Sequence, residues 1–227
     1  MIRSGLVQQR PLHVRWPVLN LFAEVMPSAP TPAAASLIYR PPSWVGRLSL
    51  PEMFARAQPL EVELGSGDGS FLAQWAAACP ERNFLGVERL LGRLRKLERK
   101  AQRAELANVR LMRIEASYFL EFLLPPCSVD ALHAYFPDPW PKRKHRRHRL
   151  VNERFPELAS RVLMPQGVVY LRTDDADYFA QMKEVFAADR RFHFVETPAE
   201  LASVTTDFER EFQARGIATL RAACQVR

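Results

Sequence analysis

Three glutamates follow short apolar runs of the sequence, and together they could surround a nucleoside that carries an amino group. Glu63 stands two residues before a turn in which Gly65 and Gly67 let the backbone bend tightly and approach a ligand. Glu88 ends the second apolar run, where an acidic side chain can accept hydrogen bonds from ribose hydroxyls. Glu115 ends the third run and is suited to receive an adenine amino group.

The glycine-rich turn differs from the common phosphate-binding motifs. It lacks the glycine spacing of dinucleotide-binding turns and the Lys-Ser/Thr pair that holds a triphosphate. The carboxylate of Glu63 would also repel phosphate, so a ligand with a positively charged amino group and a sulfonium fits better. A tight turn without a ligand, and a glutamate at position 88 that only caps a helix, are the structural alternatives.

A carboxylate between two prolines follows the fourth apolar run and leads into a strongly basic segment. Asp138 lies between Pro137 and Pro139, and Trp140 then either stacks on a base or fills the core. Residues 142–149 hold six Lys or Arg residues, almost the whole net charge of +7. Lys142 and the run after it, through Arg149, are typical of contacts to a polyanion backbone, with a solvated loop as the alternative.

Composition narrows the class of protein. The 227 residues are 48% hydrophobic and 25% charged, as in globular proteins, and no apolar run approaches the length that spans a bilayer. The N-terminal residues show no secretory signal. Three widely spaced cysteines favour neither a disulfide framework nor a zinc site. We therefore expect a cytoplasmic protein without a membrane span or a bound metal.

The chain divides by composition into an arm and a domain. Residues 1–55 contain eight of the 18 prolines, which predicts an extended, partly disordered arm that ends in a short helix near 51–58. Residues 56–227 alternate apolar runs with helical patterns, which indicates a doubly wound, mostly parallel α/β sheet. The predicted strands are 60–64, 83–87, 109–114, 129–136, 168–172 and 192–195, and the main helices 70–78, 90–106, 118–124, 151–162 and 178–188.

These motifs resemble a known family. The glycine turn and the carboxylates after the strands are similar to those of class I S-adenosylmethionine-dependent methyltransferases. The string from Tyr135 to Lys142, with the basic run that follows, resembles the F-P-D-P-W-P-K…R-H…R-R-L signature of the tRNA (guanine-N7)-methyltransferases. The resemblance runs from about Glu61 to Gly216 and implies a Rossmann-like fold, S-adenosyl-L-methionine as methyl donor, and tRNA as partner, with the guanine in the variable loop.

The resemblance also implies roles for individual residues. Asp207 stands where the family usually has lysine, and Glu115 where it more often has Asp or Asn. Asp138 would be the catalytic residue. The implied cofactor-binding residues are Glu63, Gly65, Gly67, Glu88, Glu115 and Asp138, and the implied substrate-binding residues are Lys142, Asp174, Thr206, Asp207, Phe208 and Glu209.

The implied reaction needs no strong general base. Guanine N7 carries an in-plane lone pair, so the enzyme must supply alignment and electrostatic help for the charge that forms on the purine. Asp138 can accept hydrogen bonds from guanine N1–H and N2–H₂ and favour that charge. Two alternatives remain: a methyltransferase of the same fold that acts on another RNA or base position, and a catalytically impaired RNA-binding homologue. The oligomeric state, monomer or homodimer, is open.

Overall fold

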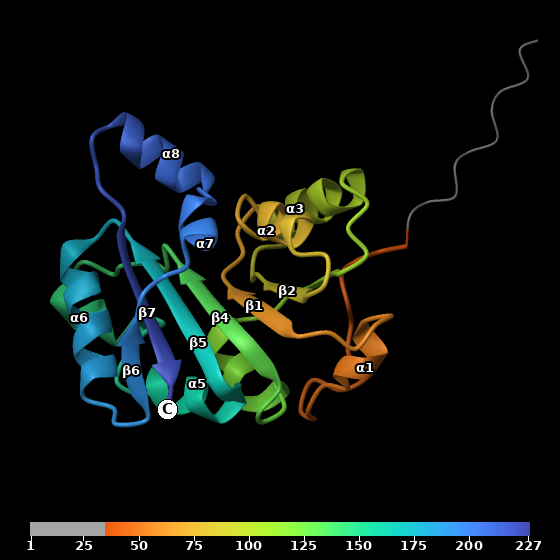
Figure 1. Ribbon diagram of the computed structural model, residues 1–227, viewed down its shortest axis with the longest axis horizontal. Coiled ribbons are helices and arrows are strands. Elements are labelled where there is room, and N and C mark those ends of the chain that lie inside the picture. The colour runs from red at the N-terminus through yellow and green to blue at the C-terminus, as the bar shows by residue number, and fades with distance from the viewer. Residues whose placement is uncertain (1–34) are drawn as a thin grey trace, which may run out of the picture. The chain divides into compact units, whose positions relative to one another are not determined.

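The computed structural model describes residues 35–227, whose strands form one seven-stranded sheet in the order β3-β2-β1-β4-β5-β7-β6 (Figure 1). Strands β1 to β5 run parallel to one another, and β7 is antiparallel to both β5 and β6. This arrangement confirms the predicted doubly wound α/β fold. The strands are β1 Leu60–Leu64, β2 Asn83–Val87, β3 Val109–Met112, β4 Val129–Tyr135, β5 Leu163–Thr173, β6 Phe192–Val195 and β7 Leu220–Val226.

Helices cover the sheet through their apolar faces. Leu94, Leu97 and Ala101 of α3 are fully buried in one cluster with α2 and strands β2 and β3, while α5 and α6 pack into a second, larger cluster. The helices are α1 Leu50–Met53, α2 Leu72–Ala78, α3 Leu91–Arg103, α4 Ala116–Tyr118, α5 Phe155–Val162, α6 Ala176–Ala187, α7 Ala199–Ser203 and α8 Asp207–Ala214, with the π-helix η1 Phe119–Leu123 and the 3₁₀ helix η2 Arg143–His148.

The strand order reverses between β1 and β4, which places the expected ligand crevice at this point. In open α/β sheets a ligand binds beyond the carboxyl ends of the strands where the order reverses. The loops that follow β1, β2, β3 and β4 all lie at these ends, because the four strands are parallel. They are the loops that carry the glycine turn, Glu88, Glu115 and Asp138.

Four elements were not predicted from the sequence: η2, β7, α7 and α8. Strand β7 alternates weakly and contains Arg221 and Gln225, so its apolar signal is poor even though Cys224 is fully buried. It takes its place in the sheet by pairing with β5 and β6, which lie far from it in the sequence. Such pairing is a tertiary effect that local pattern does not carry.

Part of the predicted N-terminal arm lies outside the described residues. Residues 1–34 of the arm are in that part, so the predicted boundary at residue 55 stays a prediction. Residues 35–55 include a parallel bridge between Ile38 and Leu111, a hydrogen bond from the Leu37 amide to Glu98 (3.0 Å), and α1. Across residues 35–227, the helices are all too short or too polar to cross a membrane.

Candidate methyltransferase site

A cavity of about 330 Å³ opens at the carboxyl ends of the strands. Four of the residues predicted from the sequence line it, one from each strand-end loop: Gly65, Glu88, Glu115 and Asp138. The structure thus brings together residues that lie up to 73 positions apart. Further lining residues that the sequence did not single out for a ligand are Leu64, Val87, Arg89, Leu90, Arg93, Ile114, Tyr135, Phe136, His148 and Leu150.

The glycine turn between β1 and α2 needs glycine for two different reasons. Gly65 has a φ of +82°, in the left-handed region that other residues avoid, and the space around it is open toward a ligand. Gly69 has a φ of +78°, and a Cβ there would lie 2.1 Å from Cδ1 of Leu97. Gly69 therefore lets α3 pack against the turn, whereas Gly65 leaves room at the cavity.

Glu88 fastens the glycine turn to the start of α3. Its Oε2 accepts a hydrogen bond from the Gly67 amide (3.1 Å), and its Oε1 accepts one from the Leu90 amide (2.7 Å). Gly67 does not line the cavity itself but is held beside it by this bond. Glu88 therefore does act as a cap at the start of α3, which was the structural alternative for this residue. Each carboxylate oxygen also keeps a second lone pair that is open to a ribose.

Glu115 makes a comparable pair of bonds one strand further along. Its two carboxylate oxygens accept hydrogen bonds from the amides of Ser117 (2.9 Å) and Tyr118 (2.8 Å), so it caps α4. Each oxygen keeps a second lone pair, and the residue lines the cavity. Glu115, which we expect to bind an adenine amino group, therefore also holds the loop after β3 in place.

Glu63 lies in β1, directly before the lining residue Leu64, and is almost completely buried. Its Oε2 has no hydrogen-bond partner among residues 35–227. Burial raises its pKa well above the ordinary value, Arg172 works against this rise, and the charges of Asp68 and Glu88 add to it. A cationic group would supply the missing partner and lower this pKa, although Glu63 itself does not line the cavity.

Asp138 lies in a loop whose backbone is strained on both sides. Phe136 and Trp140 have φ values of +50° and +44°, in the left-handed region that non-glycine residues rarely adopt. The Phe136 amide donates to the carbonyl of Arg172 (2.8 Å), and the Pro139 carbonyl accepts from another side chain, described below. The Asp138 carboxylate is exposed and makes no hydrogen bond or ion pair within the described part of the chain, so it is free to meet a ligand.

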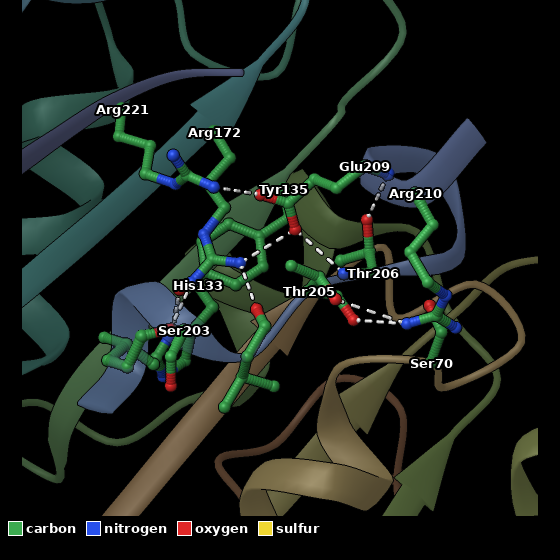
Figure 2. Close-up of polar contacts among 12 residues, drawn as sticks. Ser70, His133, Tyr135, Arg172, Ser203, Thr205, Thr206, Glu209, Arg210 and Arg221 are labelled. Carbon is green, nitrogen blue, oxygen red and sulfur yellow. Dashed lines mark hydrogen bonds and ion pairs between the residues drawn. The ribbon is translucent and has the colours of Figure 1, made fainter. Parts of the chain in front are cut away.

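The predicted substrate-binding residues Thr206 and Glu209 are buried and hydrogen-bonded to each other at the start of α8 (Figure 2). Thr206 Oγ1 accepts from the Glu209 amide (3.0 Å), and the Thr206 amide donates to Glu209 Oε2 (2.8 Å), which is a capping box. Arg172 donates to Glu209 Oε2 (2.9 Å) and Arg221 to Oε1 (2.7 Å). These contacts hold α8 in place, and a substrate contact for either residue stays a prediction.

Asp207, where the family usually has lysine, is surrounded by positive charge. Lys100 Nζ lies 3.7 Å from its carboxylate and also pairs with Asp68 of the glycine turn (3.1 Å), and Arg210 pairs with it as well. Two cations therefore face this carboxylate, and one of them, Lys100, is shared with Asp68. Of the other predicted substrate contacts, Phe208 is 47% exposed with its ring 6.1 Å from that of Phe136, Lys142 is exposed, and Asp174 is half-buried just beyond β5.

The prediction that Arg149 belongs to the exposed basic run is wrong. Its side chain is 0% exposed, whereas Arg146 and Arg147 in the same run are exposed. The Arg149 hydrogen bond to Asp177 is the largest cause of the lowered pKa of that carboxyl. The sequence did not indicate that Arg149 and Arg172 are buried. Nothing in the basic run shows that Arg149 is the residue that the fold covers, and the partners of Arg172 in β5 lie on α7 and α8, far along the chain.

Comparisons with known proteins agree with this geometry. The family model "Putative methyltransferase" matches residues 57–222. A tRNA (guanine-N(7)-)-methyltransferase of Alkalilimnicola ehrlichii is 32% identical over 210 residues, which are 92% of this chain and 81% of that protein. One of Rubrobacter xylanophilus is 36% identical over 173 residues, 74% and 77% of the two chains. Among solved structures, the 16S rRNA methyltransferase KamB matches with a TM-score of 0.54 at 17% identity, covering 78% of this chain and 92% of KamB, which supports the fold alone.

Proposed function

Since the chain belongs to the tRNA (guanine-N7)-methyltransferase family, we propose that it transfers a methyl group from S-adenosyl-L-methionine to N7 of a guanine in tRNA. The observation that carries this proposal is the meeting of Gly65, Glu88, Glu115 and Asp138 in one cavity. The resemblance favours a guanine of the variable loop. A tRNA substrate and three free cysteines favour a cytoplasmic location.

The cofactor is held by the loops after β1, β2 and β3. We assign the ribose hydroxyls to Glu88 and the adenine amino group to Glu115, since both line the cavity with unused lone pairs. Gly65 leaves space for the methionine part beside the turn. We assign the counter-charge for the cationic end to Glu63, which directly precedes the lining residue Leu64 and whose Oε2 has no partner among residues 35–227.

The chemistry depends on the bound cofactor for a methyl group carried by a sulfonium. The protein must hold guanine N7 in line with the sulfur–carbon bond, and no proton has to leave the base. Asp138 is placed in the same cavity to accept hydrogen bonds from guanine N1–H and N2–H₂, which fixes the orientation of the ring. Its negative charge also favours the positive charge that methylation creates on the purine.

The tRNA backbone is bound by the exposed part of the basic segment. Lys142, Arg143, Lys144, Arg146 and Arg147 are all exposed in or beside η2, next to the cavity that Trp140 and His148 also line. Guanidinium and ammonium groups that track phosphates release counterions, which gives affinity without sequence preference. We therefore assign the backbone to η2 and the target base to the loop that carries Asp138.

The direct test is incubation with methyl-labelled S-adenosyl-L-methionine and tRNA that lacks modifications, followed by nucleoside analysis. We expect label in 7-methylguanosine and in no other nucleoside. Label in another nucleoside would support the alternative of a different base position. Binding of tRNA and cofactor without any label would support the alternative of an impaired RNA-binding homologue.

A further inference from the structure

A single buried arginine connects the loop of Asp138 to α6. Arg149 Nε donates to the carbonyl oxygen of Pro139 (2.6 Å), Nη1 to Gln181 Oε1 (2.6 Å) and Nη2 to Asp177 Oδ2 (2.7 Å). The guanidinium also lies over the ring of Tyr178, 4.7 Å from its centroid. All three kinds of guanidinium nitrogen are thus engaged, and none is left for an external ligand in the position that Arg149 occupies.

The loop that receives this contact has few means of fixing itself. Pro137 and Pro139 have no N–H group, so the two residues next to Asp138 can be held through their backbone only by their carbonyl oxygens. On one side the Phe136 amide is bound to the Arg172 carbonyl (2.8 Å). On the other side the anchor is the Pro139 carbonyl, which directly follows Asp138 and accepts from Arg149.

We propose that Arg149 is a positioning residue for the methyl transfer, which acts by holding the Asp138 carboxylate in the orientation that the target guanine needs. The inference rests on the proposed function, because it takes Asp138 as the group that meets guanine. A preorganised group accelerates a reaction only while its geometry is kept, and a displacement of about 1 Å can lower the rate about 100-fold. Arg149 carries its effect through the Pro139 carbonyl and does not touch the substrate.

Two other roles for Arg149 make different predictions. A phosphate contact would require an exposed side chain, but that of Arg149 is 0% exposed, unlike the neighbouring Arg146. A purely structural role would lower the stability of the fold and leave the turnover of the folded fraction unchanged. A positioning role lowers kcat at saturating tRNA and cofactor, with little change in the binding of either.

Arg161 offers a matched control. Its Nη2 donates to the carbonyls of Leu120 and Glu121, each at 2.7 Å, so it also grips a backbone segment, but none of these residues lines the cavity. We expect Arg149→Met to lower kcat about 10- to 100-fold with the cofactor Kd within about twofold. Arg149→Lys, which keeps the charge and can donate to one partner, should recover part of that loss. Arg161→Met should lower Tm and leave kcat unchanged.

A double-mutant cycle with Asp138→Asn separates action through Asp138 from an independent effect. If Arg149 works by orienting that carboxylate, Arg149→Met should cost less than about threefold in kcat once the carboxylate is gone, because coupled residues are not additive. All rates are measured at a temperature well below the lowest Tm of the set. Should Arg149→Met not fold, the same cycle is run with Arg149→Lys.

Two results would overturn the positioning role. One is a rise in the KM for tRNA and a flatter salt dependence with kcat unchanged, which is the behaviour of a phosphate contact. The other is a full kcat loss in the Asp138→Asn background, which would mean that Arg149 acts elsewhere. A wild-type protein that forms no 7-methylguanosine would instead overturn the proposed function, so the two failures are distinguishable.

Discussion

Two buried arginines each hold one segment of the chain, the loop of Asp138 and the start of α8, and they differ in the acid that each one meets. Arg149 meets Asp177, whose side chain is 51% exposed, whereas Arg172 meets Glu209, whose side chain is 0% exposed. Arg172 also donates to the carbonyls of Leu201 (2.6 Å) and Val204 (2.7 Å). Loss of Arg149 would leave an acid that water can solvate, while loss of Arg172 would leave a charge inside the protein.

The difference indicates a division of labour. When the carboxylate is buried together with its guanidinium, the contact is essential for the fold, because removing one partner leaves the other as an unpaired charge inside the protein. When the carboxylate lies at the surface, loss of the contact mainly makes the loop of Asp138 mobile and costs the fold less. We therefore expect Arg172 to determine stability and Arg149 to determine the geometry at Asp138.

The largest expected effect is on folding. Arg172→Leu should lower the free energy of unfolding by about 3–5 kcal/mol, because Glu209 would keep only Arg221 as a charged partner in the interior. Denaturant titrations of Arg172→Leu and Arg149→Leu measure the comparison directly. Equal losses for the two variants would contradict the division of labour.

The next effect is on the reaction itself. Asp138→Asn keeps the shape of the side chain but removes its charge, and its NH₂ group would face the guanine donors. We expect kcat to fall about 100- to 1000-fold, with the cofactor Kd nearly unchanged. Rapid-quench measurement of a single turnover tests this. A wild-type rate, or a loss that only follows weaker cofactor binding, would remove Asp138 from its assigned role.

A pH effect is expected at Glu63, the buried carboxyl of β1 whose pKa Arg172 lowers against the effect of burial. Its raised pKa means that the carboxyl is protonated over a range above its ordinary value, and only the ionised form attracts the cationic cofactor. Cofactor affinity should therefore rise as pH rises through this pKa, by up to about tenfold per pH unit. Calorimetry between about pH 5 and about pH 8 should show proton release on binding. Glu63→Gln should abolish the pH dependence, and an unchanged pH dependence in that variant would exclude Glu63 as its source.

The smallest effect concerns the exposed arginines beside Arg149. Replacing Arg146 and Arg147 by Gln should flatten the salt dependence of tRNA binding by about 0.7–0.9 for each phosphate that the protein no longer neutralises. Arg149→Lys, measured beside it, should leave the slope as it is, since the residue is buried. If the salt dependence of tRNA binding changed in the Arg149 variant and not in the Arg146 and Arg147 variant, Arg149 would be the phosphate contact and our assignment of these residues would be wrong.

The sequence predicted which strand-end residues meet in the cavity better than it predicted the contacts around α8, for a physical reason. Gly65, Glu88 and Glu115 each follow a predicted strand, and parallel strands end at one edge of the sheet, so local pattern was enough to bring them together. Asp138 was found in the same way. The residues from Tyr135 to Lys142 predicted membership of the tRNA (guanine-N7)-methyltransferase family, and the similar proteins confirm it.

The two arginines show why the rest could not be predicted. Arg149 stands in a run of basic residues that predicts exposure, and its burial depends on α6, about 30 positions further along the chain. Arg172 pairs with Glu209 of α8, a helix that was not predicted although Thr206 and Glu209 have the spacing of a capping box. A buried charge is tolerated only when its partners are already placed, and that information belongs to the tertiary structure.

The position of β7 has a consequence for how the protein is made. This strand is the last in the chain, yet it lies between β5 and β6 and supplies a hydrogen-bonded neighbour to each. During synthesis on the ribosome, β5 therefore has an open edge until residues 220–226 emerge, and β6 has no neighbour at all. Open strand edges are prone to pair with other chains. The sheet can therefore close only after β7, the last of its seven strands to be synthesised, has emerged.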